Sequence, residues 1–250
     1  MDRPVTLARP WATDVQQTSW RASTLTDEWG LRTLLILLVV DVFVVAPLAQ
    51  EGTALSVLQP VIHSVVLVSG IAIAFRSGVT IATVVGILAV AGLVTHWAYH
   101  AHPTVALGRA DTGLSLTFTV LITGLMLLQV FRAGPITPYR IEGAVAAYLL
   151  VAYGWALAYQ LVALSDPAAF GFPPTEIPQT LRFRLLYFSL TTLSSVSYGD
   201  ITPLDPIGRS LAALEGTIGQ LFPVLLLARL VSLELYHRQD DRSRDSGPDG

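Results

Sequence analysis

The chain has 250 residues, of which 52% are hydrophobic and only 13% charged, and its formal net charge is −3. Soluble domains carry about 25% charged residues, so this composition excludes an ordinary water-soluble domain, and the negative balance argues against a nucleic-acid-binding surface. The absence of cysteine from the sequence excludes disulfides, thiol catalysis and thiolate metal sites. We therefore expect an integral membrane protein.

Residues 1–30 lack the apolar core of a signal peptide, and we expect them to form a cytosolic N-terminal arm. A helix needs about 20 apolar residues to cross the hydrocarbon core of a bilayer. Six stretches meet this requirement, namely residues 31–50, 55–75, 79–99, 112–131, 141–164 and 209–233. Residues 184–195 are apolar but too short to span, which predicts a re-entrant helix that the surrounding protein buries.

The arginines predict the orientation of these spans. With the N-terminus inside the cell, eleven arginines fall in cytoplasmic segments and four in outer ones, as the positive-inside rule requires. Both termini should then be cytoplasmic, with residues 237–250 too polar to fold and forming a disordered cytosolic tail. Residues 133–140, AGPITPYR, break the helical pattern. They divide a four-helix region, residues 31–132, from a two-helix module, residues 139–236.

The segment with a chemical signature is the short apolar helix and the residues that follow it, LLYFSLTTLSSVSYGDITP. A potassium ion gives up its water shell only where closely spaced oxygens replace it, and rings of backbone carbonyls from four chains supply such oxygens. The carboxyl end of the short helix carries a negative partial charge that favours a cation. Asp200 follows directly and would add a ring of carboxylates at the outer mouth.

This segment resembles the pore loop of potassium channels, whose usual core is Thr-Thr-Val-Gly-Tyr-Gly-Asp. Residues 142–164 and 209–232 resemble the outer and inner helices of bacterial members of the ion-channel family. The resemblance implies an all-α integral membrane fold with six transmembrane helices plus one re-entrant pore helix and filter loop. It implies a potassium-channel-like pore module in residues 139–236. The cation-binding filter residues that it implies are Ser195, Val196, Ser197, Tyr198 and Gly199.

One filter segment per chain implies a homotetramer, placed in the plasma (cell inner) membrane. The function expected is passive conduction of monovalent cations, potassium first. We expect no enzymatic activity, no cofactor or metal other than permeant K⁺ ions, and partners limited to the lipid bilayer and further copies of the chain, without nucleic acid. Two alternatives stay open: a weakly selective cation channel, or a non-conducting regulatory or assembly protein that uses the pore fold.

Ser197 is the departure from the family pattern, which has glycine at this position. Successive filter residues alternate in handedness so that their carbonyls point to one axis, and glycine adopts the left-handed conformation freely. A serine there costs about 1–2 kcal/mol, and a tetramer would accumulate this strain on one ring. This is the reason for the weakly selective alternative.

Other polar and small residues of the module invite functional interpretations. Glu215 lies two turns into the last span, where a carboxylate needs a partner. It could brace the filter through the hydroxyl groups of Thr191, Thr192 or Ser194, or bond to its own or another neighbouring helix. Gly216, Gly219 and Pro223 either form a hinge in the inner helix or permit close packing.

The four-helix region has few ionisable residues. The span 112–131 contains no arginine, which excludes a voltage sensor of the usual kind. Asp41 and His63 lie within the membrane and are expected to pair. His96, His100 and His102 gather at the outer end of the third span, where they could bind a metal or simply face water.

Overall fold

The computed structural model describes residues 32–49, 58–75, 77–131, 138–171 and 178–245, and the predicted arm, residues 1–30, lies outside these ranges. Within them the chain is helical, with one isolated β-bridge between Phe170 and Pro203. Residues 32–40 are helical and lead into a π-helical turn, η1, and a short helix, α2. The elements in chain order are η1 (Asp41–Val45), α2 (Ala46–Ala49), α3 (Leu58–Phe75), α4 (Val79–Ala101), α5 (Val105–Val130), α6 (Pro138–Ser165), α7 (Pro178–Leu193) and α8 (Pro206–Asp245).

Four helices are long and apolar enough to cross a membrane among the described residues: Val79–Ala101, Val105–Val130, Arg140–Ser165 and Pro206–Arg229. They correspond to the third, fourth, fifth and sixth predicted spans. The first and second predicted spans are helical where the structure describes them, but the first contains a π-helical turn and the second has an apolar core of only Pro60–Ile71. Membrane crossing by these two segments stays a prediction.

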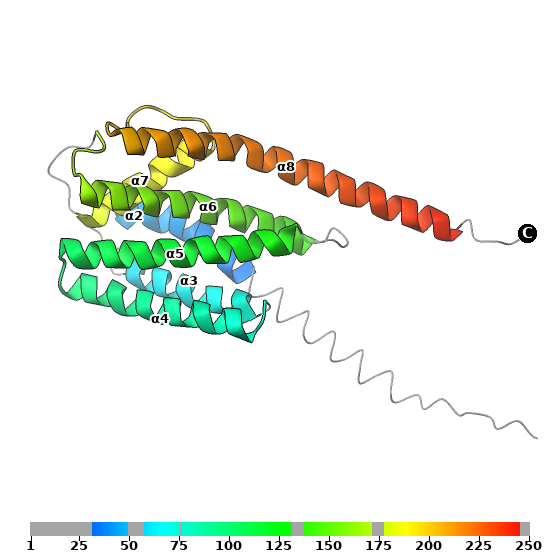
Figure 1. The fold of residues 1–250 in the computed structure, drawn as a ribbon, viewed down its shortest axis with the longest axis horizontal. Coiled ribbons are helices and arrows are strands. Elements are labelled where there is room, and N and C mark those ends of the chain that lie inside the picture. The colour runs from blue at the N-terminus through cyan, green and yellow to red at the C-terminus, as the bar shows by residue number, and fades with distance from the viewer. Residues whose placement is uncertain (1–31, 50–57, 76, 132–137, 172–177, 246–250) are drawn as a thin grey trace, which may run out of the picture.

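The helices pack side by side into an elongated bundle (Figure 1). Its main apolar core contains residues from the helical segment 32–40 and from α3, α4, α5 and α6, with Val85, Phe118 and Met126 buried. Small residues let the helices approach closely. A side chain at Gly70 of α3 would collide with the ring of Phe118 on α5.

Helix ends follow local capping chemistry. Thr104 precedes α5 and its hydroxyl oxygen accepts a hydrogen bond from the Leu107 amide at 3.2 Å, which satisfies a donor that the first helical turn leaves unpaired. Asp205 does the same for α8, accepting from the amides of Ile207 and Gly208 at 2.8 and 3.0 Å. Pro206 begins α8, where its missing N–H costs nothing.

The path of the chain from α6 to α8 forms a loop that enters and leaves the bundle at the same end. α7 begins near the end of α6 and runs obliquely inward between α6 and α8 (Figure 1). It ends at Leu193, beside Gly219, which lies thirteen residues into α8 and so about 20 Å from its start. The chain then returns to the end where Phe170 pairs with Pro203. The predicted re-entrant segment, residues 184–195, overlaps α7, which begins six residues earlier. That it re-enters a membrane stays a prediction.

The prediction of a disordered tail from residue 237 is wrong for residues 237–245, because α8 continues to Asp245. The sequence contains no glycine or proline between Pro223 and Gly247, so nothing in its backbone chemistry stops the helix earlier. Polarity decides whether a segment enters the membrane, but it does not by itself end a helix. α8 therefore projects well beyond its neighbours (Figure 1).

Gly219 marks the closest approach of α8 to α7. A β-carbon at this position would overlap the carbonyl group of Leu193, whereas one at Gly216, a turn earlier, would have as its nearest neighbour the Thr192 carbonyl oxygen at 3.8 Å, an ordinary contact. The packing interpretation of Gly219 is therefore supported by geometry, while a hinge at Gly216, Gly219 and Pro223 stays a prediction.

We expect Gly219→Ala to lower the stability of the protein, because the obstructing atoms belong to rigid backbone. The free energy of unfolding should fall by at least the roughly 1–3 kcal/mol that overpacking costs in well-packed cores. Gly216→Ala is the matched control and should be nearly neutral. Thermal unfolding of both variants in detergent, followed by circular dichroism, measures the difference; equal midpoints would contradict the packing argument.

Candidate functional site

The segment that follows α7 has alternating backbone handedness. Ser195, Ser197 and Gly199 have φ angles of 59°, 40° and 81°, all in the left-handed region, and the residues between them do not. Two of these three residues are serines, in which the left-handed conformation is strained. Ser197 therefore adopts the conformation that the sequence analysis expected of a glycine position.

The carboxyl end of α7 holds this segment through its backbone. The Thr191 carbonyl accepts hydrogen bonds from the amides of Val196 at 2.9 Å and Ser197 at 3.1 Å, and the Thr192 carbonyl accepts from Ser195 at 2.9 Å. The chain turns directly over the last carbonyls of the helix. The negative end of the α7 dipole thus lies against residues 195–197, an arrangement that stabilises a nearby cation.

Side chains from α8 and α7 add to this support. The Gln220 amide on α8 donates to the Ser195 hydroxyl at 2.6 Å. The Tyr198 ring stacks on Tyr187 of α7, with centroids 6.4 Å apart and planes within 5°. Sequence reasoning missed Gln220 and Tyr187; a polar Gln in an apolar span was the available signal for the first.

Glu215 is completely buried behind this segment, where it joins three helices. Tyr159 of α6 donates a hydrogen bond to its Oε2 at 2.5 Å, and the Ser189 hydroxyl of α7 contacts its Oε1. The Ser189 hydroxyl also lies 2.7 Å from the Ala152 carbonyl oxygen of α6. Since a serine has one proton to donate, a proton on the Glu215 carboxyl would satisfy the second contact. Every polar group of this cluster then has a partner, as burial requires.

Glu215 thus bonds to neighbouring helices, as one of the two alternatives predicted, but the hydroxyl groups of Thr191, Thr192 and Ser194 are not among its partners in the described structure. The Thr191 and Ser194 hydroxyls instead donate back to carbonyls of their own helix, those of Phe188 and Leu190, at 3.0 and 2.7 Å. This back-bonding is the usual alternative for serine and threonine in helices. Thr191 and Thr192 do support the segment, but through their carbonyl groups.

Apolar side chains remain exposed on the segment after α7 and along α8. Tyr198 is 71% and Val196 52% exposed, and Asp200 is also exposed. Much of α8 faces outward too, with the exposed apolar residues Leu214, Leu221, Val224, Leu225, Leu227 and Val231. Contiguous exposed apolar surface on this scale indicates contact with lipid or with another protein chain.

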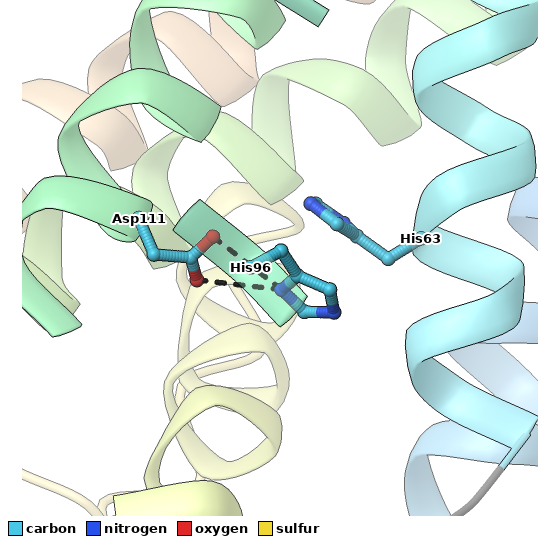
Figure 2. Close-up of side chains that lie close together, drawn as sticks. All are labelled: His63, His96 and Asp111. Atoms are coloured by element: carbon cyan, nitrogen blue, oxygen red, sulfur yellow. Dashed lines mark hydrogen bonds and ion pairs between the residues drawn. The ribbon is translucent and has the colours of Figure 1, made fainter. Parts of the chain in front are cut away.

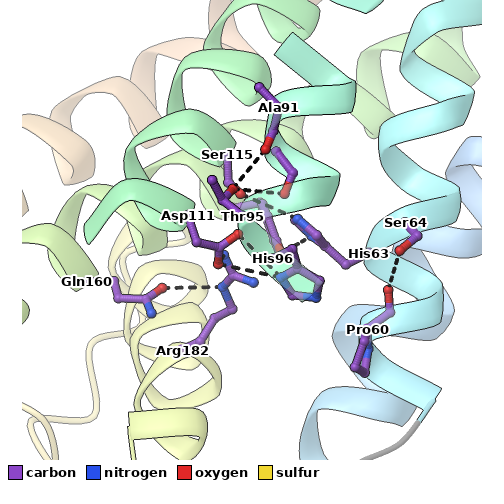
Figure 3. A network of polar contacts seen from close by, with 12 residues as sticks. Pro60, His63, Ser64, Ala91, Thr95, His96, Asp111, Ser115, Gln160 and Arg182 are labelled. Carbon is purple, nitrogen blue, oxygen red and sulfur yellow. Dashed lines mark hydrogen bonds and ion pairs between the residues drawn. The ribbon is translucent and has the colours of Figure 1, made fainter. Parts of the chain in front are cut away.

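Buried polar residues of α3, α4 and α5 form a second cluster, together with Gln160 of α6 and Arg182 of α7. Arg182 of α7 is buried there, with its Nη2 3.7 Å from Asp111 of α5 and its Nε donating to Gln160 at 3.3 Å (Figure 3). No partner for Arg182 was predicted from the sequence. Asp111 was missed.

The predicted Asp41–His63 pair is not among the contacts that the structure describes. His63 instead lies 3.4 Å from the Ser115 hydroxyl and 3.3 Å from the Tyr153 hydroxyl. Its ring packs against that of His96, with centroids 4.5 Å apart. The pairing of groups on different helices depends on the register of one helix against the other, and the spacing of residues along the chain does not determine that register.

Comparison with known proteins finds similarity in the part of the chain that contains α7, the segment after it and the neighbouring helices. Residues 147–234, most of α6 through much of α8, match a family model described as ion channel. Two curated relatives, each called Protein LctB, come from Bacillus caldotenax and Geobacillus stearothermophilus and are 33% identical over 87 and 81 residues. These alignments cover 34% and 31% of the chain, and 64% and 60% of the relatives, so less than two thirds of their length is matched. No solved structure matches the chain significantly.

The Glu215 cluster makes a testable contribution to stability. Glu215→Ala leaves the Tyr159 and Ser189 hydroxyls buried without this partner, at a cost of about 1–3 kcal/mol for each group that stays unpaired. Thr217→Ala on the same helix removes an exposed hydroxyl that bonds only to its own helix at Ala213, and it should change stability little. Thermal unfolding in detergent compares the two; a Glu215→Ala protein as stable as the control would show that the cluster is not a brace.

Proposed function

We propose, from the match of residues 147–234 to a family model described as ion channel, that the chain is a passive cation channel that conducts mainly potassium. The observation that carries the proposal is the loop after α7, where residues 195, 197 and 199 alternate in handedness above the carboxyl end of a helix. Backbone carbonyls turned toward one axis can replace the hydration shell of K⁺. Ser195, Val196, Ser197, Tyr198 and Gly199 would line that path, and Asp200 would attract cations to its outer mouth.

The proposal requires four copies of the chain, since one chain supplies one segment of each carbonyl ring. The exposed apolar residues of α8 and the exposed Val196 and Tyr198 support a packed assembly around the loop. We propose a homotetramer in the plasma membrane, with both termini cytoplasmic, in agreement with the distribution of arginines. No catalytic step and no organic cofactor enter this function.

The strained serine gives specific support to a second candidate, a weakly selective cation channel. Ser197 has a φ of 40°, a conformation that costs about 1–2 kcal/mol for a residue with a side chain. Strain on one ring of the filter would loosen the spacing of its carbonyls. Replacing Ser197 by glycine therefore tests whether the channel selects potassium or conducts cations in general.

Assembly is the first test. The purified protein should be a tetramer with a protein mass near four times 26.9 kDa, measured by native mass spectrometry after release from detergent. Chemical cross-linking in native membranes should give the same four-chain limit. A stable monomer or dimer as the sole species would refute the channel proposal, because two copies cannot close the rings.

Ion flux is the second test, and Ser197→Gly is its decisive variant. In liposomes the wild type should carry K⁺, and the glycine variant should show a higher ratio of potassium to sodium permeability because the left-handed conformation is then unstrained. Up to about 4–8 kcal/mol of strain per tetramer is relieved, which should also raise its thermal stability.

Ser194→Gly is the matched control, since Ser194 lies beside the filter without a left-handed φ. It should leave the permeability ratio unchanged. A wild type that is already sharply potassium-selective, with no gain in Ser197→Gly, would remove the weakly selective candidate and the strain argument. Absence of flux from both proteins, as assembled tetramers, would favour the non-conducting alternative.

A further inference from the structure

Three ligand-type side chains meet in the second polar cluster, away from the filter. His63 of α3, His96 of α4 and Asp111 of α5 each offer a ligand atom, and these atoms lie within 4.8 Å of one another (Figure 2). All three side chains are buried, with exposed fractions of 5%, 1% and 3%. Buried groups of this kind on three separate helices are not explained by a solvated surface.

We propose that His63, His96 and Asp111 bind a divalent transition-metal ion of the Zn²⁺ type. Two imidazole nitrogens and one carboxylate oxygen are a ligand set that Zn²⁺ and its neighbours prefer over Mg²⁺ or Ca²⁺. Ligands about 2.1 Å from a tetrahedral ion lie about 3.4 Å from one another. The widest separation in the cluster would therefore have to close by about 1.4 Å, a distance that side-chain rotation can supply.

Hydrogen bonding in the cluster leaves coordinating atoms available. Asp111 Oδ1 is buried and has no hydrogen-bond partner among the described residues, although buried polar atoms normally have one. His96 Nδ1 is the ring nitrogen that faces this carboxylate (Figure 2). The contacts that do exist are long. His96 Nδ1 lies 3.4 and 3.5 Å from the two Asp111 oxygens, and His63 lies 3.3 and 3.4 Å from its hydroxyl neighbours, beyond the usual 2.7–3.2 Å (about) of such bonds.

Arg182 is the charge that opposes a bound cation, because its Nη2 lies 3.7 Å from Asp111. Two other groups can hold the guanidinium when Asp111 turns to the ion. Gln160 accepts from its Nε, and Asp41, whose Oδ1 is buried without a hydrogen-bond partner in the described chain, interacts with Arg182 electrostatically. With Asp41 and Asp111 set against Arg182, the buried carboxylates outnumber the guanidinium and favour a further positive charge.

A route into the site runs along the end of α4. His100, the penultimate residue of α4, is half-buried, and His96 is buried one turn further in. The rings of His96 and His100 are in edge contact, with centroids 4.8 Å apart. An ion arriving at this end of the bundle would meet imidazole nitrogens at each step. His96 lies five residues, about 7.5 Å, from the last residue of α4.

The test measures metal directly in the full chain, purified in detergent without a polyhistidine tag. After equilibration with Zn²⁺ and removal of the excess, elemental mass spectrometry should find about one Zn²⁺ per wild-type chain. His96→Gln and Asp111→Asn should each weaken the affinity by more than about tenfold, the least that loss of a metal-site group costs. His102→Gln, at the exposed end of the same helix, should keep the full stoichiometry.

Retention of Zn²⁺ by folded His96→Gln and Asp111→Asn, or its loss only in His102→Gln, would overturn the proposal in favour of surface binding. Absence of Zn²⁺ from the wild type at micromolar concentration would overturn it as well. Should either variant fail to fold, X-ray absorption of the wild-type Zn²⁺ protein decides. Two imidazole ligands with bonds near 2.0–2.1 Å (about) are required, and a spectrum with fewer than two would refute the site.

Discussion

The buried carboxyl of Glu215 is the interaction on which the arrangement of α6, α7 and α8 depends. A carboxyl group can lie in an apolar interior only when its oxygens are hydrogen-bonded, and Tyr159 and Ser189 reach it from two other helices. Apolar side chains tolerate many small shifts of one helix along another, whereas this three-way contact is satisfied in a single register. The depth of α7, and with it the position of residues 195–199, follows from that register.

α7 is held at two depths by polar contacts with its neighbours. Arg182 and Ser189 are seven residues apart, so they lie on the same side of the helix two turns from each other. Ser189 engages Ala152 and Glu215, while Arg182 engages Gln160 and Asp111. The short helix therefore links α5 and α6 with the segment 195–199 that follows it.

The features that could be predicted from the sequence are those contained in one stretch of chain, whereas contacts between helices were missed. Apolar length identified the helices from residue 79 onward, and the Tyr-Gly-Asp run identified the loop that follows α7, because both signals are contained in one stretch of chain. The partners of Glu215 and Arg182 were not predictable, since they depend on how α7 is rotated against α5 and α6. The helical end of α8 was missed because polarity was taken as evidence against folding, although it bears only on burial.

The length of α8 has a mechanical consequence. Its 40 residues extend about 60 Å, roughly twice the hydrocarbon thickness of a bilayer. The portion from Gly219 to Asp245 alone is about 39 Å long. If α8 bends at the predicted hinge, this portion becomes a lever whose pivot lies beside the last carbonyl of α7. A rotation of about 10° at that pivot moves the far end by about 7 Å. Conversely, a force applied to the distal end by a ligand or a neighbouring chain would exert a turning moment on this pivot equal to the force times the length of the arm.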